Sequence, residues 1–510
     1  MTPNSKTCLP LVAGLLFLST LALAQKPWTL QWGAPHKPEN PGSIYTIVHT
    51  DQQGYYAMRC RIPNSPLSNK AQKAALELYD KDLNFVKAEA LDLEYKGESL
   101  EFTSFVSLKG KHFLLSAYYN AKQEKKYLFA RAVNLQTLKC EGEYVKIMEL
   151  EVTSKFRYPY FIPVVSPDSS LMLVYGTLNF QDGKKQRFSL AVMDSAMKVL
   201  WAQDVERPKQ KEYVGFYDYA IDNQGNAYLL GAQSHTNKEI KASKEFADYR
   251  VFAYLDGGTS FKEYEASLGE KHITEINFEV LKNGDLLCAG FYSDKGILRG
   301  LNSDKERIKG VFSYKLNGQN GKEYDKSTQE FSLKIRTSDL SSNKQEKAKN
   351  NKDNDDQELK EYVLRLLNVQ EDGSILLVGE KYHLESIPGS KAGSTRNIPH
   401  HDDLLVVKLD AKGQIAWASK VDKNQKGDIV DEFAFIPTAD KQYFIYENGF
   451  GRSDKLNLAT VSSDGKVSYA PFNAIDFKVE NGKLISPSSK TVIVWPDSNS
   501  KSRLGKLVFH

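Results

Sequence analysis

Residues Glu371–Gly379 read EDGSILLVG, a polar turn with a glycine, then aliphatic residues and a second glycine six positions after the first. Two further stretches keep both glycines at this spacing, NGDLLCAG (Asn283–Gly290) and QGNAYLLG (Gln224–Gly231). Weaker copies are QGYYAMRC (Gln53–Cys60), KGKHFLLS (Lys109–Ser116), SSLMLVYG (Ser169–Gly176), ADKQYFIY (Ala439–Tyr446) and SSKTVIVW (Ser488–Trp495). The turns of these copies are separated by 49 to 89 residues. Eight copies at a quasi-regular period indicate a repeat fold.

Each copy is flanked by further strand patterns. The stretch EYVLRLLNVQ precedes EDGSILLVG, and DLLVVKLDAKGQIAWASKV follows it as two apolar segments joined by a tight polar turn. Asp-Gly, Asn-Gly and Lys-Gly pairs in the equivalent turns allow the positive φ that hairpins require. Each unit is therefore predicted to be a four-stranded antiparallel meander. Such units without a strong helical period predict an all-β fold, a single β-propeller over residues 25–510, with eight blades or, alternatively, seven.

The last unit supplies only three strands before the chain stops, in GKLISPS, KTVIVWP and RLGKLVF. The segment WTLQWGAP (Trp28–Pro35) precedes the first unit and has no partners of its own. Because an open blade edge invites aggregation, we expect residues 28–34 to pair with residues 503–509 and complete the last blade. Trp201 and Trp417 recur at one position of the fourth strand, which favours packing between blades over a sugar-stacking platform.

The N-terminus has the features of a secretory signal. Lys6 precedes an apolar run that ends in Ala22-Leu23-Ala24. This pattern predicts a signal peptide over residues 1–24, cleaved near Ala24, and a secreted or periplasmic protein. A membrane anchor is the alternative reading of the same segment, and no later apolar run is long enough to span a bilayer.

Composition excludes some classes of function. The net charge is only +4, with charges of both signs interspersed, so no nucleic-acid-binding footprint is present. Cys60, Cys140 and Cys288 form neither a disulfide framework nor a zinc-binding pattern.

The units DLLVVKLDAKGQIAWASKV and EYVLRLLNVQEDGSILLVGEKY, with a charged insertion before them, resemble secreted β-propeller proteins of Bacteroidetes-type bacteria. This resemblance covers most of the chain after residue 24. It implies the propeller fold and export, and it carries no established activity or site residues.

The long connections are all expected on one face of the ring. Residues 62–73, 233–248, 292–309 and 381–402 join the second and third strands of their units, and a charged insertion, 334–360, joins two units. Long loops on one face of a rigid scaffold are typical of binding sites. Within the insertion, Ser341–Lys360 is nearly devoid of apolar residues and is predicted to be disordered or a solvated helix.

No strong catalytic signature is present, so we expect a monomeric, non-catalytic binding or scaffold protein whose partner is a protein or glycan of the cell envelope. The alternative is an enzyme, a hydrolase or lyase acting on glycans or peptides at the central channel. The residues expected to form the binding patch are Arg299, Arg307, Tyr382, His383, His400 and His401.

The sequence HHDD (His400–Asp403) closes the 381–402 segment near Tyr382 and His383. If the segment returns to its origin, His400, His401, Asp402 and Asp403 could converge on a divalent metal such as calcium. The alternative is that these four polar residues merely flank a strand, which is common, and in that case no cofactor is expected.

Overall fold

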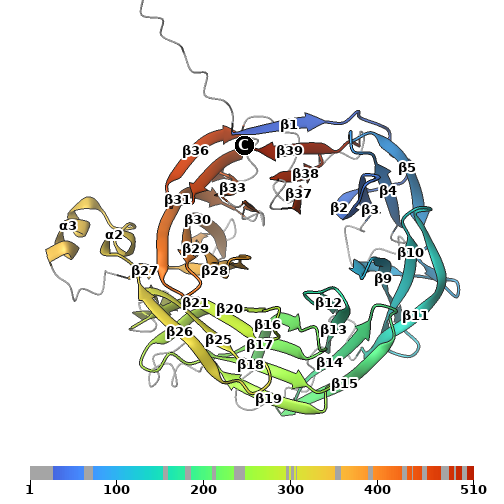
Figure 1. The fold of residues 1–510 in the computed structure, drawn as a ribbon, viewed down its shortest axis with the longest axis horizontal. Coiled ribbons are helices and arrows are strands. Elements are labelled where there is room, and N and C mark those ends of the chain that lie inside the picture. Colours follow the sequence, from blue (N-terminus) through green and yellow to red (C-terminus); the bar gives the residue numbers. More distant parts are fainter. Residues whose placement is uncertain are drawn as a thin grey trace, which may run out of the picture.

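Four-stranded antiparallel sheets follow one another around a central axis in the computed structural model of the protein (Figure 1). The structure describes residues 27–61, 73–152, 159–178, 185–208, 214–234, 247–294, 298–299, 304–305, 307–350, 358–388, 394–427, 433–438, 440–450, 456–472, 482–486, 490–496 and 502–510. The arrangement is that of a β-propeller, in which each sheet is a blade.

Within each blade the strands run from the axis outward (Figure 1). In chain order the sheets are β2 (Ser43–Thr50), β3 (Tyr55–Arg61), β4 (Lys73–Tyr79), β5 (Phe85–Leu91); β8 (Glu101–Leu108), β9 (Lys111–Asn120), β10 (Lys125–Asn134), β11 (Lys139–Glu151); β12 (Phe161–Val165), β13 (Leu171–Leu178), β14 (Lys185–Asp194), β15 (Val199–Pro208); and β16 (Val214–Ile221), β17 (Ala227–Ser234), β18 (Ala247–Leu255), β19 (Ser260–Glu265).

The second half of the chain continues the pattern. Its sheets are β20 (His272–Val280), β21 (Leu286–Ser293), β25 (Gly310–Leu316), β26 (Glu323–Glu330); β28 (Tyr362–Val369), β29 (Ile375–Pro388), β30 (Thr395–Leu409), β31 (Ile415–Lys426); β32 (Ala434–Pro437), β33 (Lys441–Glu447), β35 (Leu456–Ser462), β36 (Val467–Phe472); and β37 (Gly482–Ser486), β38 (Thr491–Val494), β39 (Gly505–Phe509), β1 (Trp28–Trp32). Shorter elements are β6 (Glu94–Tyr95), β7 (Glu98–Ser99), β22 (Leu298–Arg299), β23 (Asp304–Lys305), β24 (Arg307–Ile308), β27 (Leu359–Lys360), β34 (Gly449–Phe450), α2 (Leu333–Arg336) and α3 (Ser342–Asn350). β34 pairs in parallel with the end of β31 and adds a fifth strand to that sheet.

The two glycines of the repeat have different structural roles. The first, such as Gly373 with φ 79°, takes the left-handed conformation of the turn between the first two strands. The second lies beside a β-bulge of the innermost strand. At Gly290 an added Cβ would stand 1.9 Å from the carbonyl oxygen of Glu275, the residue that follows the bulge of β20. The spacing of six residues is therefore the distance from the turn to the bulge.

Apolar residues between neighbouring blades form the core. Each cluster of buried side chains joins two sheets that are adjacent around the ring, as where Val251 and Leu255 of one blade pack with Phe278 and Leu286 of the next. The predicted packing role of the tryptophans is confirmed at Trp201, whose Nε1 donates to the carbonyl oxygen of Gly225 in the following blade at 3.0 Å. Trp417 likewise lies against Gly465 of the following blade.

The N-terminal strand lies against the C-terminal one. β1 pairs antiparallel with β39 in the register Trp28↔Phe509 to Trp32↔Gly505. Its Trp28 packs on Phe472 of the preceding blade, with ring centroids 4.5 Å apart. The first and last segments of the described chain thus share one sheet.

A buried ionic group ties the first blade to the segment before β39, and we call it the seam cluster: Arg59, Glu77, Tyr79 and Ser502. Arg59 Nε lies 2.5 Å from Glu77 Oε1, and both side chains are fully buried. Arg59 also donates to the hydroxyl of Ser502 and, at 2.6 Å, to the carbonyl of Gly42. Tyr79 donates to Glu77 Oε2 at 2.9 Å. Every charge in the seam cluster is met by protein groups.

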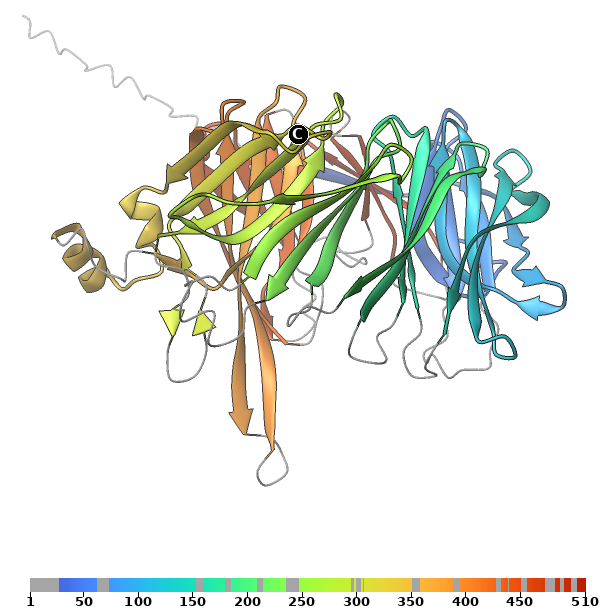
Figure 2. The same ribbon diagram turned by 90° about the horizontal axis from the view of Figure 1, so that it is seen from below.

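The structure corrects the prediction of a loop over residues 381–402. Most of this segment belongs to the long strands β29 and β30, which pair from Ile375↔Leu409 to Pro388↔Thr395. The physical reason is that two adjacent segments satisfy each other's backbone groups by pairing, although their sequence is too polar to suggest a buried strand. Figure 2 shows this orange hairpin extending well beyond the ring on one face.

The charged insertion lies outside the ring and begins with the two short helices (Figures 1 and 2). α3 is the solvated helix allowed by the sequence, with only Ala348 buried. The expectation of a solvated segment is wrong at its end, because Glu358 and Leu359 are buried and β27 pairs with β24. Parts of the other long connections lie outside the described residues, namely 62–72, 235–246, 295–297, 300–303 and 306. The predicted signal over residues 1–24 lies outside them as well. Neither helix of the described chain has the length and apolarity needed to cross a bilayer.

Candidate functional site

The candidate site lies at the base of the β29–β30 hairpin. His383 and His400 are directly opposed across the two strands, and so are Tyr382 and His401. A third strand, β31, supports the base by pairing with β30 as far as His400↔Lys426. Beyond that point, β29 and β30 pair only with each other within the described residues.

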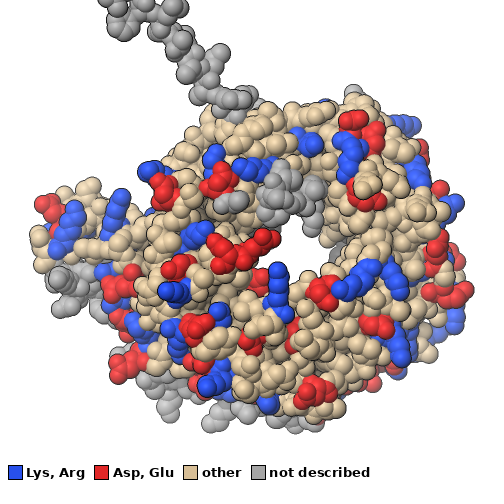
Figure 3. All heavy atoms as spheres, in the orientation of Figure 1, with Lys and Arg blue, Asp and Glu red and all other residues tan. Residues whose placement is uncertain are grey.

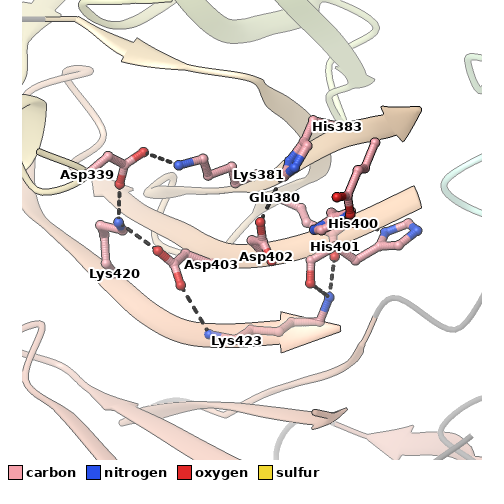
Figure 4. A network of polar contacts seen from close by, with 11 residues as sticks. Asp339, Glu380, Lys381, His383, His400, His401, Asp402, Asp403, Lys420 and Lys423 are labelled. Carbon is pink, nitrogen blue, oxygen red and sulfur yellow. Dashed lines mark hydrogen bonds and ion pairs between the residues drawn. The ribbon is translucent and has the colours of Figure 1, made fainter. Parts of the chain in front are cut away.

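Strand alternation divides the HHDD stretch between two faces. Successive residues of a strand point to opposite sides, so His400 and His401 take opposite faces. A β-bulge follows between His401 and Leu404, where Asp402 and Asp403 together lie opposite the single residue Lys381. The predicted metal set of His400, His401, Asp402 and Asp403 is corrected accordingly. His401 and Asp403 are held by other protein partners, Glu380 and Lys420, and His383 joins His400 and Asp402 (Figure 4).

We call the group on the first face the imidazole cluster: His383, His400, Asp402 and Glu385. The rings of His383 and His400 stack with centroids 4.3 Å apart. His383 Nδ1 lies 3.7 Å from Asp402 Oδ2. One ligand atom from each of His383, His400 and Asp402 lies within 4.8 Å of the other two. His400 Nε2 lies 2.8 Å from Glu385 Oε2, and this hydrogen bond holds the pKa of Glu385 below its ordinary value.

We call the group on the second face the hairpin base network: Glu380, His401, Lys423 and Arg365. Lys423 Nζ donates to Glu380 Oε1 at 2.5 Å and to the carbonyl of His401 at 3.1 Å. Nδ1 of His401 and Nε of Arg365 each lie 3.0 Å from Glu380 Oε2. Burial by itself would raise the pKa of Glu380, but the hydrogen bond from His401 and the charge of Lys423 outweigh it, so that the pKa lies below its ordinary value.

Lys381, Asp403 and Lys420 connect the base of the hairpin to the charged insertion. Lys420 Nζ lies 2.8 Å from Asp403 Oδ2 and also contacts Asp339, which follows α2. Asp339 in turn accepts a hydrogen bond from Lys381 at 2.8 Å (Figure 4). Burial opposes ionisation of Asp339, yet the two lysines bring its pKa below the ordinary value. The insertion is thereby fastened to the strands that carry the hairpin.

The expected binding patch is only partly assembled. Tyr382, His383, His400 and His401 come together at the hairpin base, with the ring centroids of Tyr382 and His401 5.0 Å apart. The expectation for Arg307 is wrong. Its side chain is only 3% exposed and lies 3.8 Å from Glu358, a residue of the insertion. A guanidinium held there is a structural ion pair and not a surface anchor. For Arg299 the structure describes only the backbone, in β22, which lies on the same face as the hairpin (Figure 2).

Sequence reasoning missed Glu385, Glu380 and Lys423. A usable signal for Glu385 was present, since His383-x-Glu385 on one strand and His400-x-Asp402 on the next are alternating patterns that would share one face of a hairpin. Glu380 and Lys423 gave no such signal, because they are separated by 43 residues and meet through β30.

Two carboxylates on neighbouring innermost strands also have perturbed ionisation. Burial raises the pKa of Asp218, on β16, to about 6; the backbone N–H of Tyr219 opposes this shift and the charge of Glu279 adds to it. Burial likewise raises the pKa of Glu279, on β20, although the N–H of Val369 donates to it at 3.2 Å. Figure 3 shows an opening at the centre of the ring with acidic and basic side chains at its edge.

No protein family model matches the chain, and no curated protein is similar to it in sequence. Solved structures of low sequence identity are similar to the chain, and two of them are named as propellers. They include the Dos1 propeller (TM-score 0.38, 11% identity, 93% of this chain and 94% of that chain). The β-propeller domain of the trilobed protease from Pyrococcus furiosus, described as having an open velcro topology, has a TM-score of 0.34 at 9% identity over 88% of this chain and 94% of that one. The periplasmic gluconolactonase of Pseudomonas aeruginosa has a TM-score of 0.33 at 13% identity, covering 77% of this chain and 86% of that one. Likeness at this level assigns neither a family nor a function.

Proposed function

We propose that this protein is an exported, non-catalytic binding scaffold that engages a protein or glycan of the cell envelope through the face bearing the β29–β30 hairpin. Export rests on the N-terminal pattern of Lys6, an apolar run and Ala22-Leu23-Ala24. The single observation that carries binding is the hairpin itself. It extends beyond its blade, and its base is held by buried charged groups (Figures 2 and 4).

The hairpin has the physical character of a recognition arm. Beyond the base it offers strand edges that no other described strand covers, and such edges are templates for pairing with a partner. Leu384 is 53% exposed there, next to the partly exposed His383. The hairpin base network fixes the direction of the arm, which lowers the conformational entropy lost on binding.

A matched pair of surface variants tests this function. Leu384→Arg changes an exposed apolar residue of the arm, and Phe261→Arg changes one of similar exposure, 48%, on the outermost strand β19. We expect the Leu384 variant to lose capture of envelope components from cells that produce the protein, while the Phe261 variant retains it. Equal capture by both variants, each with an unchanged melting temperature, would exclude the arm.

We also propose that the scaffold is an eight-bladed ring closed by β1. The pairing of β1 with β39 and the seam cluster support this closure. A chain that begins after His36 lacks the outer strand of the last blade, and we expect its melting temperature to fall sharply with loss of cooperativity. A truncated chain that melts as the intact protein does would contradict closure by β1.

One observation favours an enzyme as the second candidate function. Asp218, with its pKa raised to about 6 beside the charge of Glu279, has the ionisation of a general acid working near neutral pH. An activity of this kind on glycans or peptides would be abolished by Asp218→Asn and unaffected by Leu384→Arg. The two candidates are thus separated by the same set of variants.

A further inference from the structure

The first face of the hairpin base carries a metal-ligating pattern that the hairpin base network does not use. The patterns His383-x-Glu385 on β29 and His400-x-Asp402 on β30 bring four donor side chains together at the base of the hairpin. The direct pairing of His383 with His400 sets the centre of this group. Asp402 lies beside His383, and Glu385 lies beside His400.

We propose that the imidazole cluster binds one divalent transition-metal ion of the zinc class through His383, His400 and Asp402, with Glu385 orienting His400. The site goes beyond the proposed function and does not depend on it. The three ligand groups come from two adjacent strands of a single hairpin, so the chain supplies them without any domain movement.

The distances are close to those of a bound state. Zinc–nitrogen and zinc–oxygen bonds of about 2.0–2.2 Å in tetrahedral geometry separate ligand atoms by about 3.3–3.6 Å. The ligand atoms here lie within 4.8 Å of one another, and the pair His383 Nδ1 and Asp402 Oδ2 is already at 3.7 Å. Rotation of the side chains about their χ angles is enough to close the remaining gap.

The donor set decides the class of metal. Two imidazoles and one carboxylate suit zinc and its neighbours in the first transition series. Calcium takes six to eight oxygen ligands, which this face does not provide among the described residues, so a transition metal suits it better than the calcium that the sequence offered as an alternative to no cofactor.

Glu385 has the position of an outer-shell partner. Metal-bound histidines usually donate their second ring N–H to a carboxylate, which fixes the tautomer and the ring orientation. The contact of 2.8 Å between His400 Nε2 and Glu385 Oε2 is of this kind, and it leaves Nδ1 of His400 as the ligand atom. Three protein ligands leave one position of a tetrahedral ion for water or for a group from outside.

The test is metal binding by the purified, chelator-treated protein, measured by equilibrium dialysis with Zn²⁺ and by the visible absorption of Co²⁺. We expect one tight equivalent of Zn²⁺ and a Co²⁺ spectrum of tetrahedral intensity. The double variant His383→Ala/Asp402→Asn should lose both. Glu385→Gln should weaken zinc binding by about 10- to 100-fold while keeping the tetrahedral spectrum.

The matched control is His401→Gln, which removes the adjacent imidazole on the opposite face. It should bind Zn²⁺ within a few-fold of the original protein, and circular dichroism checks that each variant is folded. Absence of a stoichiometric equivalent in the original protein would overturn the proposal. So would undiminished binding by the folded double variant. Capture of an envelope partner by a protein that binds no zinc would refute the metal site and leave the proposed function standing.

Discussion

The seam cluster and the imidazole cluster both gather charged or titratable side chains between strands, and they differ in what surrounds them. Arg59 and Glu77 are fully buried, and their partners are a serine hydroxyl, a tyrosine hydroxyl and a backbone carbonyl. In the imidazole cluster, His383 is 31% and Glu385 50% exposed, and the donor atoms converge on one another. A closed set of partners stabilises a fold, whereas convergent donors that reach solvent are suited to a ligand.

The hairpin base network shows both kinds of environment on one pair of strands. On its face Glu380 and Lys423 are fully buried and satisfied, like the seam cluster. One residue further along, the opposite face presents the imidazole cluster. The period of two along a strand thus separates a stabilising face from a candidate binding face at the same place in the chain.

The largest effect is expected at the seam. Arg59→Ala leaves the Glu77 carboxylate buried without its counter-charge, and we expect a loss of about 3–5 kcal/mol in the free energy of unfolding. The measurement is urea or guanidinium unfolding followed by fluorescence. The control, Lys490→Ala, breaks the partly exposed pair with Asp440 and should cost about 0–1 kcal/mol. Similar losses in the two variants would show that the seam cluster has no special structural role.

A smaller and pH-dependent effect is expected at the hairpin base network. Because the pKa of Glu380 is lowered in the folded state, its contribution is fully present above the unfolded pKa of about 4.3 and is lost as pH falls through the folded value. The difference in unfolding free energy between the original protein and Glu380→Gln should therefore be greatest near neutral pH and should shrink below about pH 4.3.

Chemical unfolding of both proteins between pH 7 and pH 3 measures this difference. Lys423→Met is the complementary variant, since it removes the cation and leaves the carboxylate. A difference between the original protein and Glu380→Gln that stays constant over this range would mean that the charge of Glu380 does not contribute.

The smallest effect is expected in the charged insertion. Deleting residues 341–357 and joining the ends by a short Gly/Ser link should change the free energy of unfolding by no more than about 1 kcal/mol, because loop-closure entropy varies slowly with length. The deletion stops before Glu358, which accepts a hydrogen bond from Ser293 at 3.0 Å.

Leu359→Ala tests the buried end of the insertion, for comparison with the deleted part, residues 341–357. Leu359 is 1% exposed and packs in the core with Ile308 and Phe331. Its truncation should cost about 2–5 kcal/mol. If the deletion destabilises the protein more than Leu359→Ala does, the helical part of the insertion is the packed part.

The sequence by itself determined the repeat, the strand pattern and the turns. Gly373 and its equivalents meet a local requirement, the positive φ of a turn between two strands, and alternating apolar residues lie on either side of them. These features can therefore be predicted without knowledge of distant contacts. The pairing of the N-terminal segment with the last strand was also inferable, because one unit lacked a strand and one strand lacked a unit.

Only the tertiary structure decided the site. His400, His401, Asp402 and Asp403 are consecutive in sequence, yet their roles depend on which face each side chain takes and on the register of β29 against β30. The sequence was too polar there to predict strands. Arg307 and Glu358, like Arg59 and Ser502, meet across long separations, 443 residues in the second pair. Such ion pairs and hydrogen bonds come from the packing of segments that are distant in sequence, and a local pattern carries no information about them.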